Sequence, residues 1–434
     1  MPDMHAADRV QFHILSFEGP DRYAFAGGIA SRISGLAETL AGLGHETHLW
    51  FIGDPELPGH ERRGDLSLHR WCQWISRFHP NGVYDGEEGK QTDYARSLPP
   101  FLLANHLRPH LLDGGRAVVL AEEWQSANAV LHLDWLLRSA GLRAQVDILW
   151  NANNVFGFER IDWPRLAGAA TITTVSRYMR HCMRPLGVEA VVIPNGLSPD
   201  AFELPDRAAL NEFRYRFGDR PVLAKMARWD PDKRWLLAIE TTAELKRRGL
   251  RPLLIARGGL EAHGHEVLAA ARAAGLHILD RRWDEPGEKG LLQALSAING
   301  AEVVNLRSHV DPQARRLLFR GASAVLANSG HEPFGLVGLE AMAVGGLACT
   351  GYSGEDYAVA GRNAVVLQTG DPREFVDQYL RLRDDPMEEQ AIRRSGRVTS
   401  RQYAWPEVIE RNLFQWLEVG SSRASTRGPI RAAG

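Results

Sequence analysis

The sequence predicts an α/β protein built from two doubly wound domains. Short apolar runs of strand length alternate with helical patterns along nearly the whole chain, which is typical of βαβ units and parallel sheets. This alternation pauses once, at residues 193–205, where Pro, Asn and Gly cluster. The length of 434 residues is enough for two or three domains, each with its own core.

Composition excludes several classes of protein. Hydrophobic residues make up 44% of the chain and charged residues 24%, as in ordinary soluble globular proteins. The formal net charge of −2 gives no overall basic field for nucleic acid. Three widely spaced cysteines form neither a metal-ligand spacing nor a disulfide framework. With no signal peptide at the start and no long apolar run, we expect a cytoplasmic protein.

The first half, residues 1–200, is expected to be an N-terminal Rossmann-like domain. Apolar positions at helical spacing predict a helix over 31–43, which Gly44 ends. Residues 55–100 are rich in Gly, Pro and aromatics, and we interpret them as an insertion of loops and short helices. The predicted strands are 10–16, 48–52, 117–121, 148–150, 171–175 and 191–193.

The second half, residues 201–404, repeats the same alternation. A helix at 405–419 follows, and residues 420–434 have no periodicity, so we predict a disordered tail there. In doubly wound sheets ligands bind beyond the carboxyl ends of the strands, so the loops after strands are the ones to search. The predicted strands are 222–226, 253–256, 277–279, 303–306 and 324–327.

Gly27 and Gly28 lie between the first strand and the first helix. Paired glycines let a backbone approach an anion closely, and a helix start offers free N–H groups. Phosphate binding is one reading of this loop, and a simple tight turn is the other.

The loop AKMARWDPDKR follows the first strand of the second half. Arg228 lies just beyond the strand end and Lys233 five residues later, so a guanidinium and an ammonium can converge on a diphosphate. Asp230-Pro231-Asp232 between them is good turn chemistry. The alternative is a solvated basic turn.

The segment HEPFGLVGLEAMAVGG carries the strongest signal. Pro333 suits the first turn of a helix, which leaves the N–H groups of Phe334, Gly335 and Leu336 free to bind phosphate oxygens. Glu332 stands beside that anion site. Glu340 lies in an apolar stretch, where a carboxylate needs a hydrogen-bond partner such as ligand hydroxyls, unless it is a partly exposed helix residue.

The spacing of Glu332 and Glu340 matches the E-x7-E pattern, and EPFGLVGLEAMA resembles the retaining family 4 glycosyltransferases of the GT-B fold and the related glycogen and starch synthases. Four further segments resemble this family in the family's order. They are FAGGIASRISGLAETLAGLGHETHLW, TVSRYMRH with VVIPNGLSPDAF, ARWDPDKRW, and GRNAVVLQTGD.

The resemblance implies two Rossmann-like domains facing a central cleft, an acceptor domain followed by a nucleotide-sugar donor domain, and a last helix that crosses back to the first. It also implies a role for each candidate residue. Arg228 and Lys233 would hold the donor diphosphate, and the backbone of Phe334, Gly335 and Leu336 would complete that site. Glu332 would contact the transferred sugar and Glu340 the nucleotide ribose. Gly27 and Gly28 would approach the diphosphate from the other domain.

The sequence departs from the family on the acceptor side. The strand 117–121 ends in Glu122-Glu123-Trp124, and the next strand runs into Asn151-Ala152-Asn153-Asn154, so acids and amides replace the histidines of many relatives. Glu122, Glu123 and Asn153 are therefore candidate acceptor contacts, the alternative for both acids being a surface position. Phe25 and Ala26 stand where glycogen synthases have a lysine before the glycines.

The expected function is metal-independent transfer of a sugar, hexosyltransferase-like, from a nucleotide-diphosphate sugar, with no cofactor and an open nucleotide base. The acceptor is expected to be a sugar, a lipid-linked or a small molecule. Arg177, Arg180 and Arg184, with Met179 and Met183, suggest peripheral membrane contact or a solvated helix face. The alternatives are a GT-B-fold sugar-nucleotide 2-epimerase and a catalytically silent sugar-nucleotide-binding protein.

Overall fold

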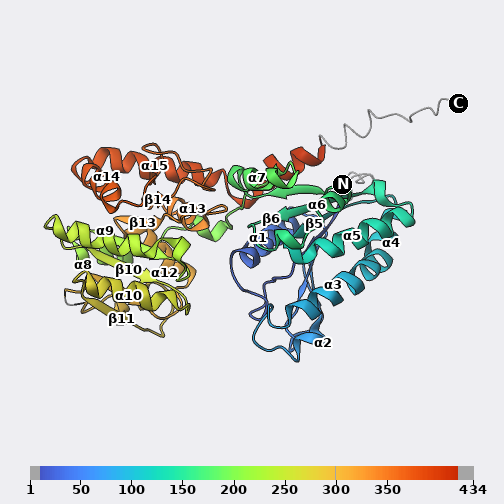
Figure 1. The fold of residues 1–434 in the computed structure, drawn as a ribbon, viewed down its shortest axis with the longest axis horizontal. Helices are drawn as coiled ribbons and strands as arrows, with labels where there is room; N and C mark the ends of the chain where they lie inside the picture. Colours follow the sequence, from blue (N-terminus) through green and yellow to red (C-terminus); the bar gives the residue numbers. More distant parts are fainter. Residues whose placement is uncertain (1–9, 299, 419–434) are drawn as a thin grey trace. The chain divides into compact units, whose positions relative to one another are not determined.

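The computed structural model describes residues 10–298 and 300–418, which divide into two compact units (Figure 1). Of the described residues, unit 1 comprises 10–196 and 405–418, and unit 2 lies within Leu197–Ala404. Each unit contains a twisted, mainly parallel sheet with helices packed on it, as the alternation of apolar runs and helical patterns predicts. The predicted tail at 420–434 lies outside the described residues.

Within the described residues, the sheet of unit 1 has eight strands in the order β3-β4-β2-β1-β5-β6-β7-β8. Neighbouring strands are parallel, except that β3 runs antiparallel to β4. The strands are β1 Val10–Leu15, β2 Thr47–Ile52, β3 His60–Arg63, β4 Leu66–Trp71, β5 Arg116–Glu122, β6 Val146–Ala152, β7 Thr171–Thr174 and β8 Val191–Val192.

The α-helices of unit 1 follow the strands, and a π-helical turn, η2 (Leu103–Leu107), continues α3 into α4. They are α1 Gly28–Gly42, α2 Gln73–Ser76, α3 Glu87–Leu102, α4 Arg108–Leu112, α5 Glu123–Ser139, α6 Trp163–Ala169, α7 Arg177–Met183 and α16 Trp405–Val408.

The expectation of loops and short helices at 55–100 is wrong. The segment contains β3 and β4, which extend the sheet, and the 16-residue helix α3. In β4, LSLHRW, five of six residues are buried, including Ser67, His69 and Arg70. Because half of its residues are polar, with His69 and Arg70 partnered inside the unit, β4 does not form the apolar run by which a buried strand is recognised in a sequence.

The segment that begins at Trp405 packs on unit 1. Trp405, Val408, Ile409 and Leu413 are buried in one cluster with the apolar face of α1 and with side chains of β1, β2, β4, β5 and β6. A π-helical turn, η8 (Ile409–Phe414), continues α16. The chain passes so close to the Trp405 ring that a Cβ at Gly196 would lie 2.3 Å from it, so this contact requires glycine.

Unit 2 has, within the described residues, a seven-stranded parallel sheet in the order β11-β12-β10-β9-β13-β14-β15. Its strands are β9 Val222–Met226, β10 Leu253–Arg257, β11 Ile278–Arg281, β12 Val303–Leu306, β13 Ala324–Ala327, β14 Ala348–Thr350 and β15 Val365–Val366. Its helices are α8 Arg207–Phe217, α9 Trp235–Arg247, α10 His263–Ala273, α11 Gly287–Ala294, α12 Pro312–Gly321, α13 Leu336–Ala343, α14 Pro372–Asp384 and α15 Pro386–Arg401, with a 3-10 turn, η7, at Pro231–Lys233.

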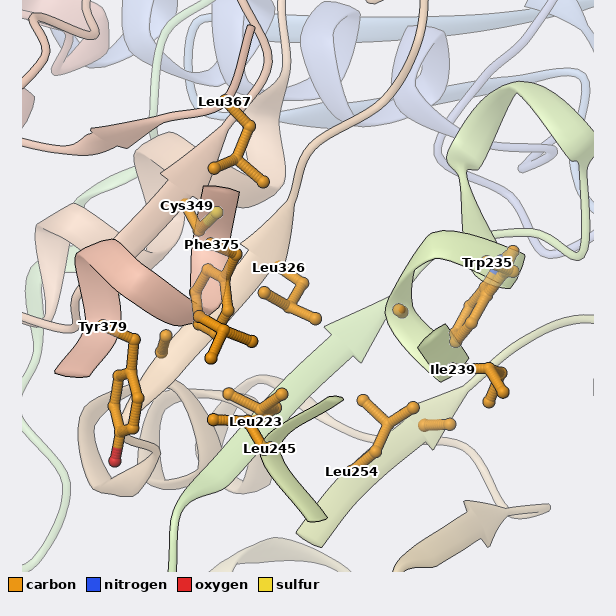
Figure 2. Packing of buried hydrophobic residues seen from close by; sticks show 14 of the residues in the cluster. Leu223, Trp235, Ile239, Leu245, Leu254, Leu326, Cys349, Leu367, Phe375 and Tyr379 are labelled. Atoms are coloured by element: carbon orange, nitrogen blue, oxygen red, sulfur yellow. The ribbon is translucent and has the colours of Figure 1, made fainter. Parts of the chain in front are cut away.

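A continuous apolar core holds α9 and α14 against the sheet of unit 2 (Figure 2). Leu223, Leu254 and Leu326 project from three neighbouring strands toward Trp235 of α9 and Phe375 of α14. Burying a large apolar side chain stabilises a fold by about 1.5–3 kcal/mol, so this cluster fixes the loops that follow β9 and β13.

The strand order places one topological switch point in each unit. In unit 1, β1 and β5 are neighbours, and the connections that follow them lead to strands on opposite sides of the sheet. The same is true of β9 and β13 in unit 2. Ligands of doubly wound sheets bind beyond the carboxyl ends of such strands. Among the helices of the described residues, none is long and apolar enough to span a bilayer.

Candidate functional site

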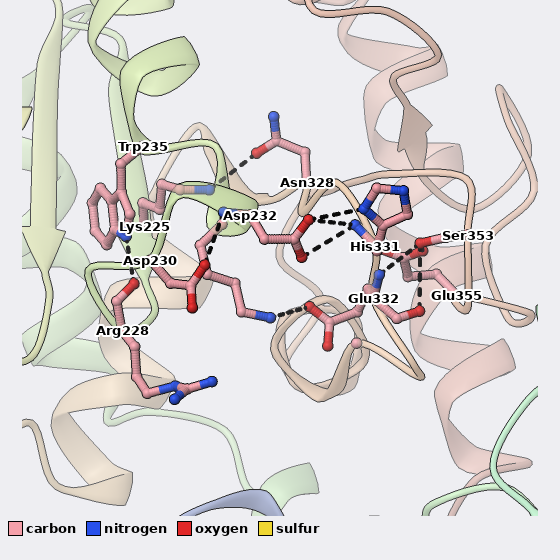
Figure 3. A network of polar contacts seen from close by, with 12 residues as sticks. Lys225, Arg228, Asp230, Asp232, Trp235, Asn328, His331, Glu332, Ser353 and Glu355 are labelled. Carbon is pink, nitrogen blue, oxygen red and sulfur yellow. Dashed lines mark hydrogen bonds and ion pairs between the residues drawn. The ribbon is translucent and has the colours of Figure 1, made fainter. Parts of the chain in front are cut away.

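The loops after β9 and β13 are joined at the switch point of unit 2 (Figure 3). Asp230 caps the short turn η7 by accepting a hydrogen bond from the Asp232 N–H at 2.9 Å. The Asp232 carboxylate in turn accepts from the backbone and ring nitrogens of His331 at 3.0 and 3.1 Å. The acidic turn of DPDK therefore fixes the start of the second loop, which positions Lys233 and Glu332 together.

Lys233 and Glu332 form an ion pair, with Nζ 2.7 Å from Oε2. Both side chains keep about a fifth of their surface exposed, so a ligand can reach them. An ammonium has three donors, and Lys233 uses one of them toward the residues that the structure describes. The two residues that the sequence predicts for diphosphate and sugar thus share one site.

Arg228 belongs to the same loop, but its guanidinium extends into solvent. Within the described residues it has no ion-pair partner, while its backbone oxygen accepts from Trp235 Nε1 at 2.7 Å. Because Trp235 is buried in the core, the base of the Arg228 side chain is fixed and its charge is free.

The start of α13 also lies at this site. Gly335 caps the helix with φ +81°, a left-handed conformation that favours glycine, and its carbonyl accepts from the buried hydroxyl of Tyr357. The backbone N–H groups of Phe334, Gly335 and Leu336 have no acceptor among the residues that the structure describes. A helix start with unpaired donors attracts anions, as the sequence analysis predicts.

Glu340 lies on α13 with a protein partner that the sequence analysis did not foresee. Nη1 of Arg315, on α12, is 3.3 Å from its carboxylate. Burial raises the pKa of Glu340, and the charge of Arg315 opposes that shift. The carboxylate is partly exposed, so it can still accept hydroxyl hydrogen bonds.

Glu355, which sequence reasoning missed, lies behind Glu332. Burial, with a contribution from the charge of Glu332, raises the pKa of Glu355 to about 7. Ser353 Oγ lies between the two, accepting from the Glu332 N–H at 2.8 Å and donating to Glu355 at 3.4 Å. The only signal in the sequence was an acid soon after a glycine-flanked strand end, which is too common to single out.

Lys225 was also missed, although it is the one charged residue in the strand VLAKM. Its buried Nζ donates to Leu326 O at 3.1 Å and to Asn328 Oδ1 at 3.2 Å, and it lies over the Trp235 ring. Burial lowers the pKa of Lys225 to about 7. Lys225 therefore ties β9 to the end of β13 beneath the Lys233–Glu332 pair.

In unit 1, a protein carboxylate occupies part of the helix start at Gly27-Gly28. Glu18 Oε2 accepts from the N–H groups of Gly27 and Ala30 at 3.2 and 3.1 Å, and Oε1 accepts from the Tyr84 hydroxyl. A charged phosphate would be repelled by this carboxylate. Gly27 already donates to Glu18, whereas the N–H of Gly28 has no acceptor among the described residues. Of the two glycines, Gly28 is therefore the one that can make the predicted diphosphate contact.

The surface alternative for Glu122 and Glu123 is wrong, because both are buried. Glu122 Oε1 accepts from Arg32 Nε at 3.1 Å, and Oε2 accepts from the side-chain amides of Asn151 and Asn153 at 2.8 and 2.7 Å. Burial is possible because the Arg32 charge and these donors compensate the carboxylate. Glu122 therefore holds β5, β6 and α1 together.

Glu123 differs from its neighbour. It begins α5 with φ +66°, an uncommon conformation for a residue with a side chain, and accepts from the Asn153 N–H at 2.8 Å. Burial raises its pKa to about 8, and the charges of Glu122 and Glu18 add to the shift. A protonated carboxyl at the switch point of unit 1 can donate as well as accept hydrogen bonds, so Glu123 and Asn153 remain acceptor candidates.

The methionines of α7 cannot contact a membrane, because Met179 and Met183 are fully buried. The apolar face of the helix packs inward, whereas Arg177 at its start and Arg184, directly after its end, are exposed. Peripheral membrane contact by this segment stays a prediction, and it would have to be made by the arginines, since the methionines are buried.

Residues 208–399 match the family described as glycosyl transferases group 1. No curated protein sequence matches the chain. Sucrose-phosphate synthase from Thermosynechococcus elongatus is similar in structure at 17% identity, with a TM-score of 0.64 over 95% of this chain and 100% of that one.

Two further solved structures are similar over nearly the full length. Anabaena Alr3699/HepE in complex with UDP has 13% identity and a TM-score of 0.61, covering 95% of this chain and 100% of that one. The UDP-forming α,α-trehalose-phosphate synthase from Burkholderia xenovorans, in complex with glucose-6-phosphate, has 14% identity and a TM-score of 0.65, covering 94% and 100%. The chain thus has the GT-B fold, its residues 208–399 form a glycosyltransferase domain of group 1, and the protein is a glycosyltransferase.

Proposed function

We propose that this protein is a retaining glycosyltransferase of family 4 that moves a sugar from a nucleotide-diphosphate sugar to a hydroxyl group without a metal ion. The observation that carries the proposal is the Lys233–Glu332 pair, 2.7 Å apart, beside the unpaired N–H groups at the start of α13. This arrangement offers positive charge to a diphosphate and a carboxylate to sugar hydroxyls within one site.

Each group in unit 2 has a task in this proposal. Lys233, Arg228 and the N–H groups of Gly335 and Leu336 bind the diphosphate and stabilise the charge that develops as it departs. Glu332 accepts hydrogen bonds from the transferred sugar. These fixed positive groups take the place that a divalent cation has in other transferases, which is why we propose metal independence.

The nucleotide ribose is assigned to Glu340 on α13, together with its ion-pair partner Arg315 on α12. Glu340 accepts from the ribose hydroxyls, and Arg315 keeps it ionised against the effect of burial. A carboxylate in this role is familiar from other doubly wound nucleotide-binding domains.

UDP-glucose is the first donor to test. The similar Anabaena protein has been solved with UDP, with UDP and glucose, and with UDP-glucose. The acceptor is proposed to be a sugar or a sugar phosphate, because the similar trehalose-phosphate synthase is described in complex with glucose-6-phosphate. Glu123 and Asn153 are the groups in unit 1 that would contact its hydroxyls.

The decisive experiment incubates the protein with UDP-glucose and a panel of sugars and sugar phosphates, and detects products by mass spectrometry. NMR of the product should show the anomeric configuration of the donor, and EDTA should leave the rate unchanged. Glu332→Gln, which keeps the size of the side chain, should remove transfer.

Three results would contradict the proposal. An inverted product would exclude retention, and a loss of rate in EDTA that manganese or magnesium restores would exclude metal independence. Conversion of the donor alone into an epimer, with no transfer to any acceptor, would favour the 2-epimerase instead.

A further inference from the structure

A cavity of about 550 Å³ lies in unit 2 at the opposite edge of the sheet from the Lys233–Glu332 pair. Its lining residues Arg220, Arg251 and Glu302 lie one or two residues before β9, β10 and β12, whereas the donor loops follow β9 and β13. A five-residue strand spans about 16 Å, so the two regions are separated by at least the length of β9.

The cavity is lined by four cations, Arg216, Arg220, Lys246 and Arg251, and by one carboxylate, Glu302. Lys246 Nζ is 2.6 Å from that carboxylate. Arg216 pairs with Glu212 on its own helix. Neither Arg220 nor Arg251 has a carboxylate within ion-pair distance among the residues that the structure describes.

Arg220 is held in place by backbone carbonyls. Its Nε donates to Arg251 O at 2.9 Å, and its Nη2 donates to Pro252 O at 2.9 Å and also to Ala301 O. Burial lowers the pKa of Arg220; the negative charge of Glu302 opposes that shift, and the positive charge of Arg251 adds to it. The fixed guanidinium of Arg220 and the exposed Arg251 thus line one cavity in which four cations face a single carboxylate, and an anion there would reduce the repulsion between the cations.

Apart from Ser296, the rest of the lining is apolar and includes Phe217, Leu250 and Leu295. The volume falls in the range of about 300–1,000 Å³ that is typical of small-molecule sites. We propose that this cavity binds a small phosphate-bearing molecule at a second site, separate from the donor site. The phosphate lies between Arg220, whose Nη1 has no acceptor among the described residues, and Arg251, whose guanidinium offers paired donors. The remainder of the molecule packs on the apolar lining.

The test uses the full chain carrying Arg228→Ala and Lys233→Ala, so that phosphate capture at the donor site is removed. The probes are inorganic phosphate and phenyl phosphate, measured by calorimetry and by the midpoint of thermal unfolding, which a ligand of the folded state raises. Tighter binding of phenyl phosphate would identify a phosphorylated metabolite, and equal binding of the two would identify phosphate itself.

Arg251→Glu in this background is the critical variant, because the Arg251 side chain is exposed and its backbone carbonyl, which Arg220 uses, stays in place. We expect at least about a tenfold loss of affinity for both probes, since one of two charged partners becomes repulsive. Arg272→Glu, at another exposed position of unit 2, makes the same charge change and should bind the probes as the parent does.

Equal binding by the Arg251→Glu and Arg272→Glu variants would overturn the proposal, as would no binding of either probe at about 10 mM. Arg251→Ala removes the charge without reversing it and should give a smaller loss in the same direction. Circular dichroism of each variant checks that the fold is retained.

Discussion

At the residue scale, Arg228 and Lys233 are expected to act on turnover more than on donor affinity. Both are assigned to the departing diphosphate, so their interactions strengthen as negative charge develops in the transition state. Arg228→Ala and Lys233→Ala should each lower kcat about a hundred- to a thousandfold, by analogy with single oxyanion donors.

The control for this series is Lys289→Ala, an exposed cation of the same unit, which should keep full activity. The double variant should lose less than the product of the single losses, because the two residues act together. Arg228→Lys should not restore turnover, since a planar fork and a point charge differ in geometry. Near-normal turnover in both single variants would remove the assignment.

A second residue-scale prediction concerns nucleotide affinity. Glu340→Ala should weaken binding of free UDP more than Glu332→Ala does, because Glu340 is assigned to the ribose. A lost charged hydrogen bond costs about 1.5–3 kcal/mol, or about ten- to a hundredfold in affinity. Arg315→Ala should weaken binding in the same direction, since it leaves the mostly buried Glu340 carboxylate without its ion-pair partner. Calorimetry giving equal affinity for wild type and Glu340→Ala would refute this.

The raised pKa of Glu355 predicts that the free energy of unfolding of unit 2 depends on pH. Its pKa is raised to about 7, against about 4.3 in an unfolded chain, so the folded state binds the proton more tightly. The stability that this proton contributes is present below pH 4.3 and is lost as pH rises to about 7, by at most about 1.4 kcal/mol per pH unit.

Glu355→Gln keeps an uncharged side chain of similar size at every pH and should remove this dependence. Chemical denaturation between pH 5 and 8 measures it, with Glu240→Gln, at an exposed position of the same unit, as the control. If wild type and Glu355→Gln show parallel pH profiles, the carboxyl does not titrate in this range.

At the scale of elements, β1, β2 and β4 place histidines on one buried face of the sheet of unit 1. His13, His48 and His69 alternate with the apolar residues of the core cluster, so period two carries them to the opposite face. The His69 ring stacks on Trp50 with centroids 3.7 Å apart, and His48 Nδ1 lies 3.0 Å from His69 Nε2.

Burial and neighbouring histidines lower the pKa of His13, His48 and His69, to about 4 for His48 and about 2 for His69. In the unfolded chain these residues take up protons near pH 6.5, whereas in the folded unit they stay neutral. The stability of unit 1 should therefore be fully present above pH 6.5 and fall steeply as the pH drops below it.

Calorimetry at pH 7.5 and pH 5 tests this prediction. His69→Phe, which keeps an aromatic ring against Trp50, should reduce the loss on acidification, whereas the exposed His331→Phe in unit 2 should not. The same loss in wild type and His69→Phe would show that these histidines do not control the acid sensitivity.

The fold class followed from the sequence, because continuous apolar runs in βαβ order are compatible with few other folds. Most strands lie within two residues of their predicted bounds. β3 and β4 were not predictable in this way, since His69 and Arg70 are buried through partners distant in the chain. Of the candidate site, the resemblance assigned Lys233 and Glu332 to the same donor, but their direct ion pair was not predicted. Glu18 at the start of α1 and Arg315 beside Glu340 were not predicted either, because neither partnership has a local pattern.

At the scale of the whole molecule, each unit has its own apolar core, and the chain returns to unit 1 after completing unit 2. The stability of the first unit therefore depends on residues that lie more than 200 positions away from it in sequence. Arg32 links the two parts of unit 1, since its guanidinium pairs with Glu122, donates to Asn195 and lies 5.6 Å from the Trp405 ring.

Trp405→Ala should therefore destabilise unit 1 and leave unit 2 unchanged. Trp405 is 1% exposed, and removing a buried aromatic side chain costs about 3–5 kcal/mol, because its contacts are lost and the cavity closes only in part. Hydrogen exchange read by mass spectrometry should show lower protection in peptides from β1, β5 and α1, and unaltered protection in those from β9 and β13. Leu380→Ala, a partly buried position against the core of unit 2, is the reciprocal control and should affect only unit 2. Equal loss of protection in both units of the Trp405 variant would mean that they unfold as one cooperative structure.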